Sequence, residues 1–335
     1  MELTVDRLTK QFKNKIAVDR VSLTLRPGVC GLLGANGAGK TTFMRMLCGV
    51  LKPTSGTVTF QGQDVSTEEY RKNLGYLPQD FGYYPEFTGR DFLIYLSVLK
   101  GMDKRSARNR SQELLETVGL EEKGKKKIKT YSGGMKQRLG IADVLMKDPQ
   151  IIIMDEPTLG IDPEGMRELL ALIRQLSEED QRTILISSHQ LHQVQQICDR
   201  VGIFVKGKLI ACGSVGELAV QLQSEGNYIL ELEAYPHDDR LENLLHTVEG
   251  VKKITKENEM ILVHSDRDCH NDVIVTLLMN GYDLRRLRQR GGDLDEIYSK
   301  YFEKAGETYD SDTGKRKGFR DNFRSLVRHA SGKGK

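Results

Sequence analysis

Hydrophobic and polar positions follow two different periods in the first two-thirds of the chain. Short apolar or β-branched runs, separated by helical patterns, predict strands at 29–33, 74–77, 151–155, 183–187 and 201–205. Strands that alternate with helices build an α/β fold, in which helices pack on a sheet. Residues 3–6 and 21–25 instead alternate with period two, which predicts half-exposed antiparallel strands and a mixed layer near the N-terminus.

From Tyr228 onward, the hydrophobic pattern predicts short strands and helices that follow one another closely. The pattern predicts a strand, a helix, two paired strands, a helix and a strand, at 228–233, 238–248, 251–256, 260–264, 269–279 and 284–288. The order β-α-β-β-α-β is that of a small ferredoxin-like α+β unit, and a further helix is expected at 293–302. We therefore expect an α/β domain at 1–215, an accessory domain at 216–304 and a tail at 305–335.

Length and composition fit this division. A chain of 335 residues is longer than one hydrophobic core usually organises. Apolar residues make up 38% and charged residues 29%, as in globular proteins, and the net charge of +3 argues against general coating of nucleic acid. No nucleic-acid partner is expected.

Cysteine usage and hydropathy indicate the redox compartment of the chain and whether the chain crosses a membrane. The five cysteines lie far apart and form no C-x-x-C pair, so neither a disulfide framework nor a zinc site is indicated, and a reducing compartment fits best. No run reaches the eighteen or so apolar residues that a membrane helix needs. If the protein serves a membrane, we expect another chain to cross it.

The C-terminal tail is basic. Between Lys315 and Lys335 its lysines and arginines face one acid, Asp321. A solvated tail is the plainer interpretation. Its few apolar residues also fit one face of a helix, and contact with an anionic membrane surface is the alternative.

The sequence GANGAGKT at 34–41 matches the P-loop pattern. It follows an apolar strand that ends at Leu33 and opens a helical pattern over 41–51, which Pro53 stops. Glycines let backbone N–H groups turn toward phosphates, while the helix N-terminus adds partial positive charge. The residues expected to bind the nucleotide here are Gly34, Asn36, Gly37, Gly39, Lys40, Thr41 and Thr42.

Three side chains of this loop have separate expected tasks. Lys40 reaches the β- and γ-phosphates, and the Thr41 hydroxyl is a ligand for Mg2+. Thr42 is placed to donate to a phosphate oxygen. The motif predicts a bound nucleotide with Mg2+, and the resemblance described next implies that the nucleotide is ATP.

A second motif narrows the class of P-loop protein. Residues 131–138, YSGGMKQR, resemble the signature of ABC ATPases, and they precede the apolar run 151–154, which ends in Asp155, Glu156 and Pro157. Gln79, Asp162 and His189 stand where that family has further elements. The resemblance covers roughly residues 1–215. It implies a RecA-like core with an antiparallel β layer and a helical subdomain.

The resemblance also implies a dimer. In this family each signature completes the ATP site of the facing subunit, so Ser132 and Gly134 would contact the γ-phosphate held by a second copy or a related ABC subunit. A serine hydroxyl and a bare N–H at a helix start suit that contact. Asp162 resembles the residue that links the two composite sites. Tyr131 departs from the leucine usual at the first signature position.

Hydrolysis of ATP needs charge neutralisation at the phosphates, an oriented water and a proton acceptor. The resemblance assigns Asp155 to Mg2+ and Glu156 to the general base. It assigns Gln79 to Mg2+ and the attacking water, and His189 to the γ-phosphate. Phe12 stands where the family stacks an aromatic ring on adenine, although a core aromatic is the alternative.

The leading functional hypothesis is the ATPase subunit of a membrane exporter, bound to a separately encoded transmembrane permease at the cytoplasmic face of the membrane. The aromatic segment 80–100 is a candidate groove for a partner's helix. The exporters resembled are those of the drug, bacteriocin and antibiotic-resistance group. The alternatives are a soluble ABC ATPase of translation or DNA repair, and a P-loop module that binds nucleotide without catalysis.

Overall fold

The structure is a computed structural model. It describes residues 2–304 apart from 180, 224–227, 258–259 and 291–293. The basic tail predicted for 305–335 lies outside the described residues. The chain divides into two compact units, the first ending at Cys212 and the second beginning at Gly213, and each is described by itself.

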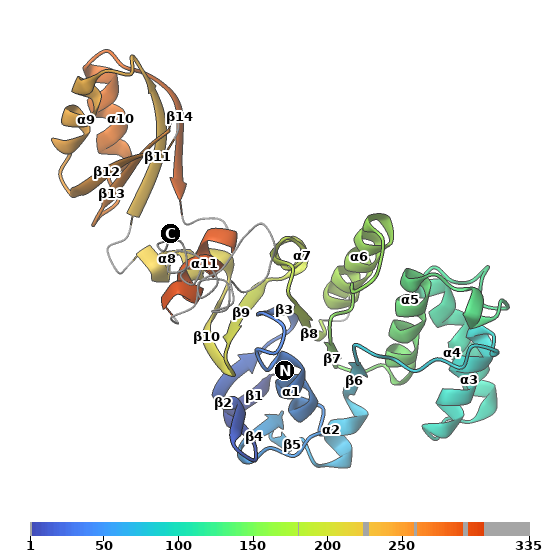
Figure 1. The fold of residues 1–335 in the computed structure, drawn as a ribbon. Helices are drawn as coiled ribbons and strands as arrows, with labels where there is room; N and C mark the ends of the chain where they lie inside the picture. The colour runs from blue at the N-terminus through green and yellow to red at the C-terminus, as the bar shows by residue number, and fades with distance from the viewer. Residues whose placement is uncertain (1, 180, 224–227, 258–259, 291–293, 305–335) are drawn as a thin grey trace, which may run out of the picture. The chain divides into compact units, whose positions relative to one another are not determined.

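A six-stranded sheet forms the centre of the first unit (Figure 1). Its order is β10-β9-β3-β8-β7-β6, from Lys208–Gly213, Arg200–Val205, Gly28–Leu33, Thr183–Ser188, Ile151–Met154 and Leu74–Leu77. The pairs of β3 with β8 and β9, and of β7 with β6 and β8, are parallel. The five strands expected from apolar runs are therefore confirmed, whereas β10 was not predicted.

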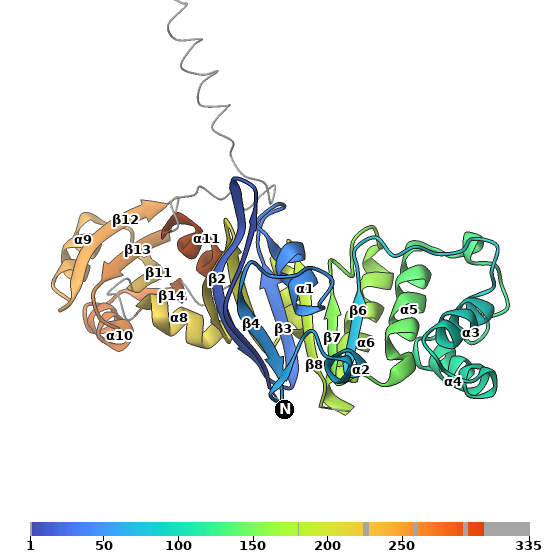
Figure 2. The same cartoon turned by 90° about the horizontal axis from the view of Figure 1, so that it is seen from below.

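An antiparallel layer lies beside this sheet, as Figure 2 shows. Its order is β2-β1-β4-β5, from Lys15–Leu25, Leu3–Phe12, Ser55–Phe60 and Gln63–Asp64. The expected antiparallel strands at the N-terminus are confirmed, and they are longer than predicted because bulges keep β1 and β2 paired across shifts of register.

The first helix lies in the core between these two layers. Helix α1 spans Lys40–Leu47 and buries Phe43, Met44 and Met46 against apolar residues of both sheets. It ends earlier than the predicted Leu51, because Gly49 takes a left-handed conformation with φ +68°. The short helix α2 (Glu68–Lys72) follows, with Thr67 accepting a hydrogen bond from the Tyr70 N–H at its start.

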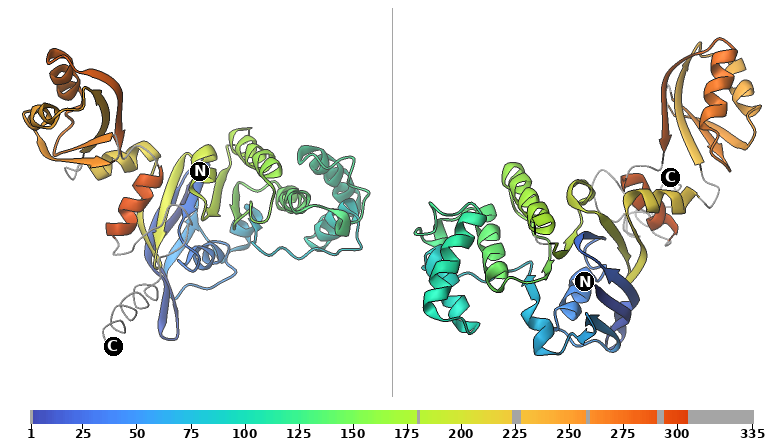
Figure 3. Two further views of the ribbon diagram at one scale, coloured as in Figure 1. Left: turned by 45° about the horizontal axis from the view of Figure 1, so that its top comes forward. Right: turned by 180° about the vertical axis from the view of Figure 1, so that it is seen from behind.

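A separate group of helices stands beyond β6. It contains α3 (Gly89–Leu99), α4 (Lys104–Thr117) and α5 (Gly133–Val144). The side chains of Thr88, Asp103 and Ser132 accept backbone hydrogen bonds at the three helix starts. Both views in Figure 3 show this group, cyan and green, on the side of the sheet away from the blue antiparallel layer.

Two more helices follow strands of the six-stranded sheet. Helix α6 (Pro163–Glu179) comes after β7, and α7 (Leu191–Ile197) comes after β8. Leu169, Ile173 and Ile197 join the core that includes Ile152 and Ile184 of the sheet. Because the strands are parallel, the loops after β3, β7 and β8 meet at one edge of the sheet.

The second unit has its own sheet and core. The order is β12-β13-β11-β14, all antiparallel, from Val251–Glu257, Met260–Ser265, Tyr228–Tyr235 and Asp283–Arg290. Helices α9 (Asp239–His246) and α10 (His270–Met279) contribute Leu241, Leu245 and Leu277 to this core. The described elements follow the predicted order β-α-β-β-α-β.

Helices α8 (Val215–Gln223) and α11 (Leu294–Lys304) complete the second unit and contact each other. Among the described residues, no helix has the length and apolar character needed to cross a bilayer.

Candidate functional site

The loop 34–39 forms a tight cradle between β3 and α1. Gly37 and Gly39 have φ of +77° and +109°, which side chains rarely tolerate. A Cβ on Gly34 would lie 2.4 Å from the Phe204 carbonyl oxygen, and one on Gly39 would lie 2.4 Å from that of Ala17. The backbone can take this path only because these positions are glycine.

Lys40 begins α1 and points into the site. It is 6% exposed, and its Nζ donates to the Gly34 carbonyl at 2.5 Å. Burial lowers the pKa of Lys40, while the carboxylate of Glu156 opposes that lowering. No side chain caps the N-terminus of α1, and Thr41 and Thr42 are half-buried in its first turn. The arrangement leaves a cation and a helix N-terminus facing the same space.

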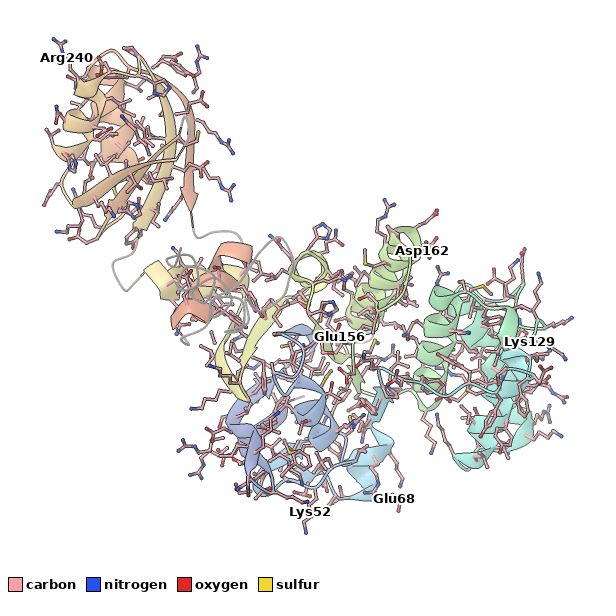
Figure 4. All side chains as sticks on the ribbon, viewed as in Figure 1. Lys52, Glu68, Lys129, Glu156, Asp162 and Arg240 are labelled. Atoms are coloured by element: carbon pink, nitrogen blue, oxygen red, sulfur yellow. The ribbon has the colours of Figure 1, made fainter. Side chains whose placement is uncertain are left out.

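Two carboxylates follow β7 in buried positions. Asp155 is 1% exposed and Glu156 is 6% exposed. Figure 4 shows Glu156 where β7 ends, close to the centre of the first unit. Its φ of +49° is unusual for a residue with a side chain and turns the chain sharply after Asp155.

Ser187 on β8 joins these two acids, because β7 and β8 are neighbours in the sheet. Its hydroxyl donates to Asp155 Oδ1 at 2.6 Å and accepts from the Glu156 N–H at 2.8 Å. Ser187 was not predicted as a site residue. The signal for it is weak, since Ser187 is one of two consecutive serines and only strand order brings it to the carboxylates.

Asp155 is suited to Mg2+. Its Oδ2 is buried and has no hydrogen-bond partner among the described residues. A buried carboxylate oxygen without a donor is unfavourable unless a cation neutralises it. The described residues contain no group of three His, Cys, Asp or Glu that could hold a metal. Mg2+ usually takes one or two carboxylates together with phosphate and water, so this environment fits it.

Glu156 lies between Lys40 and His189. Its Oε1 is 3.6 Å from Lys40 Nζ, and its Oε2 is 2.9 Å from His189 Nδ1. His189 comes directly after β8, where sequence placed it. Lys40, Asp155, Glu156, Ser187 and His189 are called the catalytic centre below.

Ser132, Gly134 and Asp162 form a second set, called the signature edge below. Ser132 is exposed at the start of α5, where its hydroxyl accepts from the Met135 N–H at 3.3 Å. Asp162 is exposed before α6, as labelled in Figure 4, and accepts from the Gly165 N–H at 3.2 Å. No hydrogen bond or ion pair within the described part of the chain joins this edge to the catalytic centre.

The start of α5 packs closely on the loop that precedes Asp162. A Cβ on Gly133 would lie 2.9 Å from the Gly160 carbonyl oxygen, and one on Gly134 would lie 3.4 Å from Ile161 Cγ2. Tyr131, the departure from the usual signature leucine, is buried and donates from its hydroxyl to the Lys123 carbonyl at 2.8 Å. This buried hydrogen bond anchors the start of the signature to the segment that contains Lys123.

Gln79 and Phe12 are both exposed to solvent. Gln79 is exposed just after β6, and no hydrogen bond to it is found within the described residues. Phe12 ends β1, is 46% exposed, and has the ammonium of Lys10 5.1 Å from its ring centroid. Phe12 is therefore not a core aromatic, and part of its ring is available for contact.

The comparisons with known proteins all identify the same family. Residues 18–159 match the family model for ABC transporter. The chain is 36% identical over 301 residues to the ABC transporter ATP-binding protein YxlF of Bacillus subtilis (strain 168), which covers 89% of this chain and 98% of that protein. It is 33% identical over 279 residues to the linearmycin resistance ATP-binding protein LnrL of the same organism, covering 82% and 89%.

A solved structure shares the fold. The structure of cbiO1 from Clostridium perfringens, part of the ABC transporter complex cbiONQ, matches with a TM-score of 0.59 and 29% identity. The match covers 66% of this chain and 91% of that chain.

Proposed function

This chain belongs to the ABC transporter family as an ATP-binding subunit that hydrolyses ATP, and we propose that it energises export through a separately encoded membrane permease. The position of Glu156 is the observation that supports ATP hydrolysis by this site. A buried carboxylate lies between the P-loop lysine and His189, at 3.6 Å and 2.9 Å. The resistance protein LnrL, similar over most of its length, supports the export direction.

The P-loop would hold the phosphates of ATP. Backbone N–H groups of the loop and the start of α1 face the same space as Lys40 Nζ, which would exchange its bond to the Gly34 carbonyl for phosphate oxygens. Thr41, Asp155 and Gln79 would hold Mg2+, and Thr42 a phosphate oxygen. When bound, Mg2+ supplies neutralisation of the phosphate charge.

Glu156 would act as the general base. A carboxylate that accepts the proton of the attacking water must lie within hydrogen-bond reach of it, beside the γ-phosphate. Ser187 holds the Glu156 backbone, and His189 contacts one carboxylate oxygen, so the other oxygen can turn toward water. His189 would then contact the γ-phosphate as well.

The signature edge would work on the ATP of a second subunit. Ser132 and Gly134 are at a helix start whose N–H groups suit an anion, yet no hydrogen bond or ion pair among the described residues joins them to the P-loop of their own chain. A head-to-tail dimer would place each signature on the facing P-loop, with Asp162 between the two sites. Phe12 would stack on adenine, where a phenyl ring serves without a hydroxyl.

The aromatic segment 80–100, which includes α3, would receive the permease. Tyr84 and Tyr95 are exposed and their rings contact at 5.8 Å between centroids. The neighbouring Tyr83 donates from its hydroxyl to the Lys136 carbonyl of α5 at 2.6 Å. A partner helix that packs on these rings would therefore act on α5, the helix that Ser132 caps.

The second unit is proposed to be a ferredoxin-like accessory domain at 216–304. Its sheet order and the two helices packed on one core support this. We propose that the chain works at the cytoplasmic face of the membrane through the permease.

The test is ATP turnover by the purified chain. Lys40→Ala removes a charged partner of the phosphates, so its affinity for ATP should fall about tenfold to a hundredfold and turnover with it. Glu179→Gln, an exposed change at the end of α6, is the matched control and should match wild type. Equal turnover by wild type and Lys40→Ala would refute the assignment of the site.

A further inference from the structure

One buried amide lies beside the catalytic centre without belonging to it. Gln193 of α7 is 2% exposed. Its Oε1 accepts from the Thr158 hydroxyl at 2.6 Å and lies 3.4 Å from the Ser188 hydroxyl, which also donates to it. Its Nε2 donates to Gln190 Oε1 and to Met166 Sδ. Both halves of the amide are therefore used.

These partners come from the two loops that carry the site. Thr158 stands between Glu156 and Asp162 in the loop after β7, and it is itself 7% exposed. Ser188 and Gln190 flank His189 in the loop after β8. A single side chain thus contacts residues on both sides of His189 and a residue two positions after Glu156.

The contacts need a polar group of this shape. The buried hydroxyl of Thr158 needs an acceptor, because an unsatisfied buried donor costs about 1–3 kcal/mol. Gln193 supplies a carbonyl oxygen to hydroxyls and an NH2 group to the Gln190 side chain, so the amide acts as acceptor and donor at once. The same side chain donating toward Met166 reaches the first turns of α6, just after Asp162.

We infer that Gln193 is a positioning residue that joins the loop of Glu156 and Asp162 to the loop of His189. The inference rests on the proposed function and deepens it. A change at Asp162 on the signature edge would move Thr158, and Gln193 would pass that movement to Ser188 and Gln190 around His189. The distance from Glu156 to His189 is held by this amide as well as by their own contact.

The test compares kcat and KM for ATP in five variants. Gln193→Leu removes every hydrogen bond of the amide, so kcat should fall about tenfold to a hundredfold as Glu156 and His189 lose their relative position. KM should stay within about twofold, because the P-loop is untouched. Gln193→Glu keeps an oxygen that accepts from Thr158 and Ser188 but loses the NH2 group that donates to Gln190, so its kcat should fall less than that of Gln193→Leu.

Thr158→Val removes the same contact from the other side, so it tests the inference even if Gln193→Leu does not fold. It should lower kcat to a similar degree, and the double variant should show no further fall, because both changes remove one shared interaction. Gln196→Leu is the matched control. It changes an exposed glutamine of the same helix whose partner is His192, and kcat should equal wild type.

Wild-type kcat in both Gln193→Leu and Thr158→Val would overturn the inference, as would equal losses in the leucine and glutamate variants. Additive losses in the double variant would also contradict it. Absence of ATP turnover in the wild-type chain would overturn the proposed function and the inference together, so the two failures are distinguishable.

Discussion

At the catalytic centre Lys40, Asp155 and Glu156 are 6%, 1% and 6% exposed, whereas Ser132 and Asp162 of the signature edge are exposed. The buried charges find partners within the chain, through the Gly34 carbonyl, Ser187 and His189. The exposed polar groups make only local hydrogen bonds at their own helix starts. The difference fits the proposal that the catalytic centre is assembled by folding of one chain, whereas the signature edge works with a second subunit.

The largest expected effect separates chemistry from binding at the catalytic centre. Glu156→Gln keeps the shape of the side chain but removes proton acceptance, so kcat should fall about a hundredfold to ten-thousandfold. ATP binding should persist, since Lys40 and the P-loop are unchanged. Turnover and nucleotide affinity of the purified variant measure the two quantities. Turnover within about threefold of wild type would remove Glu156 from the role of base.

A smaller effect is expected at Ser187. Ser187→Ala leaves Asp155 Oδ1 and the Glu156 N–H without their buried partner, which should lower the free energy of unfolding by about 1–3 kcal/mol. The kcat should fall about tenfold, because both carboxylates lose a fixed position. Thermal unfolding and ATP turnover provide the readouts. Ser188→Ala is not a suitable control, since that hydroxyl contacts Gln193, and Ser106→Ala on the exposed side of α4 serves instead.

The smallest effect is expected where the signature edge meets the core. Tyr131→Phe removes only the hydroxyl that donates to the Lys123 carbonyl, so the free energy of unfolding should fall by about 0.5–1.5 kcal/mol. Turnover should change less than twofold, because Ser132 and Gly134 keep their helix start. A large loss of turnover with little change in stability would show that this tyrosine does more than anchor the signature.

Much of the fold follows from local pattern. The apolar runs predicted five strands, which the structure shows to be parallel, because strands buried on both faces are almost continuously apolar. Glycine spacing predicted the P-loop, because those positions need φ values and close approaches that side chains prevent. Strand β10 was not predicted, although its sequence KLIACG contains four consecutive apolar residues at 209–212.

The contacts that organise the site were not predictable in this way. Ser187 is 32 residues from Asp155, and Gln193 is 35 residues from Thr158. They meet because β7 and β8 are neighbours, and that strand order is not written in any local pattern. The end of α1 at Leu47 also depended on one left-handed glycine inside an otherwise helical pattern.

The central claim is that the signature edge completes the ATP site of a second subunit. Size-exclusion chromatography with light scattering, in the presence of Mg-ATP, tests it in the Glu156→Gln background, where bound ATP is not consumed. We expect a dimer for Glu156→Gln, and a monomer that still binds ATP for the Ser132→Arg, Glu156→Gln double variant, because arginine fills the space of a close phosphate contact. An ATP-dependent dimer formed equally well by the double variant would contradict the account.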